Sequence, residues 1–265
     1  MTDALHFERP PLDEVVCGVQ FAGVEWSVIH FGLFYTQIRE RYQRTQRRPP
    51  IPPSLFDPNM QLGPAQVVFS SDLDLPLVWY ESDDTPFLLQ VQKDAFFVNW
   101  RHQSGAFTYP HFHTREGGQE GVWDRFVREW HMFSSFCDQH TIGTPEVLAC
   151  HLAYINHMVH GEMWDVPADL ARWFLPLSGL HGGDAVSLFH MTMIFQVDGL
   201  SLRLQFRPAV RIADKKKLFV IELIVSGKLS AETPLAAWFD KAHTAIVQTF
   251  LAQTTEEAHQ EWRLA

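Results

Sequence analysis

Histidine is the residue type that most invites a chemical interpretation, because it occurs 14 times in 265 residues. His111 and His113 are separated by one residue, and an extended segment would place both imidazoles on one side, where they could bind a metal ion. His157, His160 and Glu162 form a second group that could cooperate through a turn. Neither group has the spacing of a recognised zinc motif, and solvated loop histidines are the simpler interpretation, so no cofactor is expected.

Signatures of other catalytic chemistry are missing from the sequence. It contains no G-x-S-x-G nucleophile elbow, no P-loop and no G-x-G-x-x-G turn. The three cysteines, Cys17, Cys137 and Cys150, form no C-x-x-C pair and lie among apolar residues. This pattern predicts buried free thiols in a reducing compartment, and such thiols are usually inert.

One short segment is strongly basic. Five arginines lie within ten residues, opposed only by Glu40: Arg39, Arg41, Arg44, Arg47 and Arg48. Such a cluster could hold phosphate or an acidic partner surface, so Arg44 and Arg47 are candidate binding residues. The simpler interpretation is a solvated helix end that runs into a Pro-rich loop. The net charge of −10 argues against non-specific nucleic-acid binding by the whole molecule.

Polar and aromatic residues gather where predicted strands end. Asn and His at strand ends are well placed to line a cleft. The alternative is that the asparagines only satisfy backbone groups where the strands finish. The candidate ligand- or partner-binding residues of this kind are Asn99, Trp100, Arg101, Asn156 and His157. Tyr109, in the polar loop over residues 102–121, is a further candidate.

The elements that must position these residues follow from hydrophobic periodicity. Helices are predicted over residues 26–42, 122–137, 166–177 and 234–250, and strands over 14–21, 67–69, 77–80, 87–100, 145–154, 186–196, 200–212 and 218–227. An Asp-Gly pair at 198–199 predicts a hairpin turn.

The predicted elements appear in the same order twice. The segment 145–154 resembles the opening strand, and each half ends in a Trp-anchored amphipathic helix. The expected fold class is therefore α+β, with internally duplicated β-α-β-β-(β)-α halves, a mostly antiparallel sheet and helices on one face. The halves would be residues 1–142 and 143–265, joined in one compact unit.

Composition supports a folded protein. Hydrophobic residues make up 46% and aromatic residues 13% of the chain, the opposite of a disordered sequence. The first residues have no basic start and no apolar core, so no signal peptide is expected. No apolar stretch approaches the roughly 20 residues that a membrane-spanning helix needs. The expectation is a cytoplasmic protein without a membrane partner.

Several segments together resemble a sporadically distributed, functionally uncharacterised bacterial protein family of similar length. They are residues 10–21, 30–32, 90–94, 99–101, 109–110, 154–157 and 208–210. The resemblance runs from about Phe7 to Trp262. It implies a bacterial, cytoplasmic protein of an accessory type, and it supplies no catalytic residues.

These observations favour a non-enzymatic binding protein that presents a sheet face or the cleft between its halves to a protein partner. Trp, Phe and Arg, which are typical of interface hot spots, are abundant. The partner could be a second copy, as in a homodimer. A metal-dependent, hydrolase-like enzyme that uses a histidine cluster is the alternative. An RNA or nucleotide binder that uses the segment 39–48 is the weaker alternative.

Overall fold

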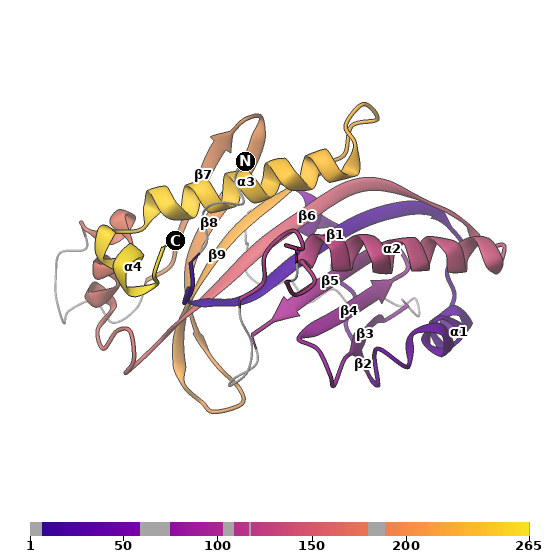
Figure 1. The fold of residues 1–265 in the computed structure, drawn as a ribbon, viewed down its shortest axis with the longest axis horizontal. Coiled ribbons are helices and arrows are strands. Elements are labelled where there is room, and N and C mark those ends of the chain that lie inside the picture. Colours follow the sequence, from indigo (N-terminus) through magenta and orange to yellow (C-terminus); the bar gives the residue numbers. More distant parts are fainter. Residues whose placement is uncertain (1–6, 59–74, 103–108, 117, 180–188, 265) are drawn as a thin grey trace.

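The computed structural model describes residues 7–58, 75–102, 109–116, 118–179 and 189–264. These residues form a nine-stranded antiparallel sheet with the strand order β2-β3-β4-β5-β1-β6-β9-β8-β7. The strands are β1 Leu12–Val24, β2 Arg44–Arg48, β3 Leu77–Glu81, β4 Phe87–Gln92, β5 Ala95–Arg101, β6 Gly143–Val159, β7 Met191–Val197, β8 Leu200–Val210 and β9 Lys217–Lys228. The two long central strands, β1 and β6, pair with each other (Figure 1).

Helices cover one face of this sheet. They are α1 Val28–Ile38, α2 Val122–Gln139, α3 Leu235–Gln253 and α4 Glu256–Glu261, with the 3-10 helices η3 Pro167–Arg172 and η4 Leu175–Leu177. The 3-10 helix η2 Pro53–Phe56 lies on the opposite face. Figure 1 shows α2 and α3 lying along the central strands. None of the described helices is long and apolar enough to span a membrane. The expected α+β class with a mostly antiparallel sheet is confirmed.

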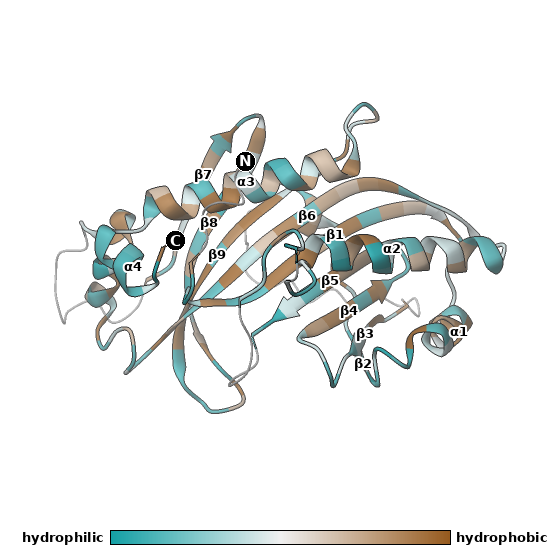
Figure 2. Cartoon of the chain, viewed as in Figure 1, coloured by the Kyte–Doolittle hydropathy of each residue, from teal (hydrophilic) through white to brown (hydrophobic). Residues whose placement is uncertain are grey.

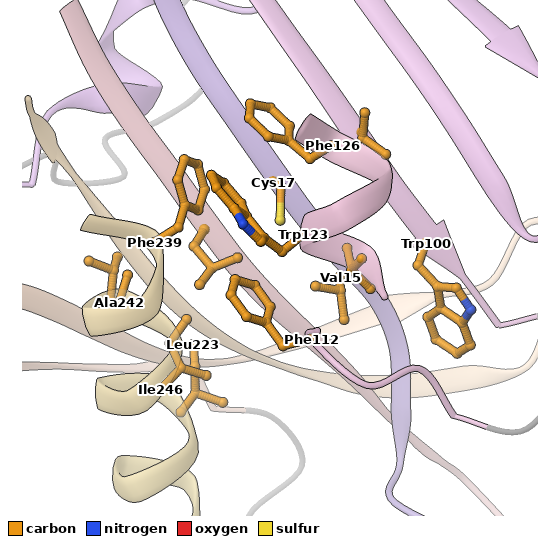
Figure 3. Packing of buried hydrophobic residues seen from close by; sticks show 14 of the residues in the cluster. Val15, Cys17, Trp100, Phe112, Trp123, Phe126, Leu223, Phe239, Ala242 and Ile246 are labelled. Atoms are coloured by element: carbon orange, nitrogen blue, oxygen red, sulfur yellow. The ribbon is translucent and has the colours of Figure 1, made fainter. Parts of the chain in front are cut away.

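The main core lies between the sheet and α2 and α3. Residues at helical spacing give α2 an apolar stripe that includes Trp123, Phe126 and Phe133, all buried. Val15 and Cys17 of β1 point toward this stripe because alternate residues of a strand face the same side (Figure 3). Colouring by hydropathy shows the apolar side of both helices against the sheet and polar residues outside (Figure 2).

The opposite face of the sheet carries a shorter cover. Residues 49–58, including η2, cross this face, and Phe56 stacks on Phe97 with ring centroids 5.7 Å apart. Two hydrogen bonds from the Gln92 side chain hold this segment on the sheet. Its Nε2 donates to the Ile51 carbonyl (3.0 Å), and its Oε1 accepts from the Ile51 N–H (2.8 Å). The α-helices therefore cover one face of the sheet, and the segment 49–58 crosses the other face.

Two predicted helices are wrong in part. The helix predicted over 26–42 ends at Ile38, and residues 44–48, expected as a helix end and a loop, form the edge strand β2. The outer edge of β3 provides backbone partners for this strand, from Arg44 opposite Glu81 to Arg48 opposite Leu77. The helix predicted over 166–177 is two 3-10 turns, since Pro176 has no N–H to continue an α-helix.

The hairpin turn predicted at Asp198-Gly199 is confirmed. Asp198 and Gly199 have φ values of 49° and 77°, as a type I′ turn requires, and they join β7 to β8. The strand predicted over 67–69 lies outside the described residues.

Candidate functional site

A pocket with a cavity volume of about 90 Å³ opens on the helix-covered face of the sheet. Its walls come from the segment before β1, from β1, β6 and β9, from residues 109–112 and from α3. The apolar walls include Phe7, Pro10, Leu12, Pro110, Phe112, Leu223, Ile246, Val247 and Phe250. Five residues with polar groups, Tyr109, His111, Tyr154, Asn156 and His243, complete the lining.

Residues 109–112 are held in place by the beginning of α2. The backbone N–H of Val122 donates to the His111 carbonyl (3.2 Å), and that of Trp123 donates to the Phe112 carbonyl (2.9 Å). The first N–H groups of a helix have no partner inside the helix, so this segment satisfies two of them. Gly121 permits the close approach, because a Cβ there would lie 2.6 Å from the Phe112 carbonyl oxygen.

The same segment is attached to α3. Phe112 is buried and stacks on His243 with ring centroids 4.2 Å apart and an interplanar angle of 7°. The Nε2 atom of His113 lies 2.8 Å from Oδ1 of Asp240. Figure 3 shows Phe112 between α2 and α3, facing Leu223 and Ile246. The pocket wall therefore links residues that are more than a hundred positions apart in the sequence.

Tyr154 and His243 form a hydrogen-bonded pair in the pocket. The Tyr154 Oη atom lies 2.9 Å from Nδ1 of His243, and the tautomer of the imidazole decides which group donates. Tyr154 comes from β6 and His243 from α3. The pair brings a hydroxyl and an imidazole beside an otherwise apolar wall, so a bound group could exchange hydrogen bonds with them.

Asn156 has both of the roles considered for it. Its Nδ2 donates to the Ile221 carbonyl on β9 (3.2 Å), and its side chain also lines the pocket. Tyr109 stacks on His102 with ring centroids 5.5 Å apart. Burial raises the pKa of Tyr109, and the negative charge of Asp13 raises it further, so the phenol keeps its proton at neutral pH.

Trp100 is not available to a partner. Its exposed fraction is 2%, and its side chain lies on the helix side of β5, within the core (Figure 3). The expectation that Trp100 forms part of a binding surface therefore requires correction. Its neighbours Asn99 and Arg101 point to the opposite face, because successive residues of a strand alternate between faces.

Asn99, Arg101 and Arg44 take part in polar networks on that opposite face. Asn99 is buried, where its Oδ1 accepts from Gln90 (2.7 Å) and its Nδ2 donates to Glu14 (2.6 Å). Burial raises the pKa of the Glu14 carboxyl more than this hydrogen bond lowers it. These hydrogen bonds satisfy buried polar side chains and so stabilise the sheet.

The arginines at this end of the sheet have acidic partners. Arg44 lies 3.4 Å from Glu81 and 2.5 Å from Asp83, and Arg101 lies 3.7 Å from Glu81. Arg47 is exposed on the edge strand β2. The predicted basic cluster is therefore divided. Arg39 and Arg41 follow α1, where Arg41 lies 3.2 Å from Glu129 of α2, and the other three arginines lie on the edge strand β2.

Within each of the two predicted histidine groups, the members contact different partners. The Nδ1 atom of His157 lies 3.0 Å from Oδ1 of Asp13, whereas the ring of His160 packs edge-on against Trp164. Glu162 pairs with Lys216 at 2.5 Å. His111 lines the pocket, while His113 contacts Asp240 on α3. Among the residues that the structure describes, no three His, Cys, Asp or Glu side chains are grouped to hold a metal ion.

The three cysteines are buried free thiols, as predicted. Burial raises the pKa of Cys137 and of Cys150 to about 12, and it also raises the pKa of Cys17. A thiol with such a pKa is almost entirely protonated at neutral pH and is a poor nucleophile.

His243 is the pocket residue that sequence reasoning missed. It follows Phe239 by four residues and precedes Ile246 by three, so it occupies a position of the apolar stripe of α3. A histidine within such a stripe was the available signal. Its partner Tyr154 belongs to a strand end that the sequence analysis did single out.

No family model matches the chain, and no curated protein matches it.

Proposed function

We propose that this protein is a non-enzymatic binding protein whose pocket accepts one aliphatic side chain of a protein partner. The observation that carries the proposal is the convergence of Tyr109, His111 and Asn156 around a single apolar pocket. Tyr109 and His111 come from the segment 109–112, and Asn156 comes from β6. Tyr109 and Asn156 are candidate binding residues from sequence alone, and His111 is a candidate metal ligand.

The size of the pocket favours a side chain over a cofactor or a substrate. Its volume is about 90 Å³. Pockets for small molecules usually measure about 300–1,000 Å³, and even benzene fills an engineered cavity of about 150 Å³. A single anchoring side chain needs less room, because the rest of the partner can lie on the surface.

The chemistry of the lining fits such an anchor. Burial of one aliphatic side chain such as valine or leucine contributes about 1.5–3 kcal/mol, and the walls formed by Leu12, Leu223 and Ile246 provide the apolar surface. The Tyr154 hydroxyl and the His243 imidazole would then exchange hydrogen bonds with the backbone that carries the anchor. This combination of apolar walls and hydrogen-bonding groups supports recognition of a side chain together with its backbone.

The pocket lies where the two proposed halves meet. Outward from β1 the strands run β5, β4, β3 and β2, and outward from β6 they run β9, β8 and β7. Apart from the edge strand β2, which has no counterpart among the described residues, the second half therefore has the order of the first. A long helix, α2 or α3, follows each set. We infer that residues 1–142 and 143–265 are two copies of one unit, within a bacterial cytoplasmic protein of an accessory type.

Site-specific photo-crosslinking tests the proposal. A photoreactive residue replaces Val247, which lines the pocket, or the adjacent Gln248, which is exposed on α3 outside the lining. In the native host, position 247 is expected to crosslink to one discrete polypeptide through a single side chain, identified by mass spectrometry. Position 248 is the matched control. Equal crosslinking at both positions, or none at 247, would refute the proposal.

A further inference from the structure

The strand β7 ends the sheet opposite β2, and among the described residues no strand pairs with its outer edge. Its sequence, MTMIFQV, has no charged residue, no proline and no glycine. Edge strands usually carry charges, prolines or bulges that prevent pairing with another chain. This edge has none of them, so its backbone groups are open to a further strand.

The other end of the sheet shows the contrast. All five residues of β2 are exposed, and Arg44, Arg47 and Arg48 are three of them. A second copy of β2 would meet these charges with its own, and like charges directly opposite each other are unfavourable. One edge of the sheet is therefore protected by charge, and the other is not.

We propose that β7 pairs antiparallel with β7 of a second copy of this chain. A two-fold axis at Ile194 would place Met193 opposite Phe195 on the helix side of the sheet. On the other side it would place Thr192 opposite Gln196. Apolar residues would therefore face apolar residues, and polar residues would face polar residues. Such self-complementarity is what a symmetric dimer requires, and it identifies the second copy as the occupant.

The side chains of β7 have surface to bury in this pairing. Ile194 is 52% exposed, and it would pack against its own copy across the axis. Met193 and Phe195 are only half-buried against the main core. The strand is also preformed, because all seven of its residues pair with β8, from Met191 opposite Phe206 to Val197 opposite Leu200.

The size of the contact predicts a dimer that depends on concentration. A stable interface uses about 20–30 residues on each side, whereas β7 contributes seven. The pairing therefore belongs to the weak, transient class of interfaces. It is independent of the pocket, which lies against β1, β6, β9 and α3, so either proposal can fail alone.

Charge-swapped variants at the axis test the pairing. In sedimentation velocity over a concentration series, the wild type is expected to shift from monomer to dimer. Ile194→Lys and Ile194→Asp should each weaken the dimer about ten-fold or more, because each places like charges opposite each other. An equimolar mixture of the two should restore it. Ile212→Lys, at an isoleucine that is 83% exposed outside the strand, should behave like the wild type.

The two substitutions also separate dimerisation from effects within one copy. Arg203 lies opposite Ile194 on β8, so Lys and Asp at position 194 change the monomer in opposite directions. Only pairing across the axis weakens the dimerisation of each variant alone and strengthens it when the two variants are mixed. A wild type that stays monomeric at every concentration, or a dimer unaffected by both variants, would overturn the proposal.

A disulfide gives a second readout. Directly opposite residues have Cβ atoms about 4.5–5.5 Å apart, near the range that a disulfide spans. The three native cysteines are buried, so Ile194→Cys adds the accessible thiol. Oxidation should produce a covalent dimer of Ile194→Cys, and far less with the control Ile212→Cys. Equal yields from the two variants would count against the symmetric register.

Discussion

Replacement of Trp100 by alanine should destabilise the fold strongly. Trp100 is 2% exposed and belongs to the core between β5 and the helices. A buried aromatic side chain removes about 150–250 Å² from water. At about 25 cal/mol per Å², its loss corresponds to about 4–6 kcal/mol, and measured Trp→Ala substitutions in cores cost about 3–5 kcal/mol.

The adjacent residue gives the matched control. The Arg101 side chain is 31% exposed, and its Nη2 lies 3.7 Å from Glu81, a distance typical of a weak ion pair. Glu81 is buried, and it keeps Arg44 as a second cationic partner at 3.4 Å when Arg101 is removed. Arg101→Ala should therefore lower the free energy of unfolding much less than Trp100→Ala. The two variants differ by one position in the strand but point to opposite faces of the sheet.

Urea denaturation followed by circular dichroism measures both variants. The expected result is a large fall in the midpoint for Trp100→Ala and a much smaller one for Arg101→Ala. Tyr109 lies 6.1 Å from Trp100 between ring centroids, so the first variant should also loosen the pocket wall. If Trp100→Ala lost less than about 1 kcal/mol, or less than Arg101→Ala, the placement of this residue in the core would be refuted.

Three further predictions concern the pocket wall and buried titratable groups. Gly121→Ala should lower the melting temperature and weaken partner binding, because its Cβ would meet the Phe112 carbonyl oxygen at 2.6 Å; an unchanged thermal melt would contradict this. Burial lowers the pKa of His151 from 6.5 to about 3, so below pH 6.5 the unfolded chain binds a proton that the folded protein does not. The free energy of unfolding should therefore fall as the pH is lowered from 6.5 to 3. Denaturant titrations at several pH values should show a smaller dependence of this free energy on pH for His151→Gln than for the wild type. The three buried thiols should not react with a thiol reagent in the native protein and should all react in urea; native reactivity would contradict their burial.

The sequence predicted elements whose signal is local. The stripe from Trp123 to Phe133 determines α2, and the Asp198-Gly199 pair determines the hairpin, because both depend on near neighbours. The strand β2 has no apolar alternation, since it is the sequence RTQRR. It becomes a strand because β3 offers an edge, which is a tertiary effect that propensity does not contain.

The candidate site was predicted in part for the same reason. Alternation predicts that Trp100 and Arg101 face opposite sides of the sheet, but it does not say which side the helices cover. The pocket also depends on the contact between Phe112 and His243, which are far apart in the sequence. Asn156 was found because predicted strand ends gather polar residues, and Tyr109 belongs to a segment that carries the family resemblance, whereas their common wall with α3 required the fold.

Native mass spectrometry tests the central claim most directly. Untagged protein is purified gently from its own host as the wild type, as Val247→Phe, which fills the pocket, and as Gln248→Phe, which adds the same side chain outside it. Circular dichroism confirms that all three are folded. The wild type and Gln248→Phe should carry a second, different polypeptide that Val247→Phe lacks. A stoichiometric metal ion or small organic molecule on the wild type, or a polypeptide that Val247→Phe retains, would contradict the account.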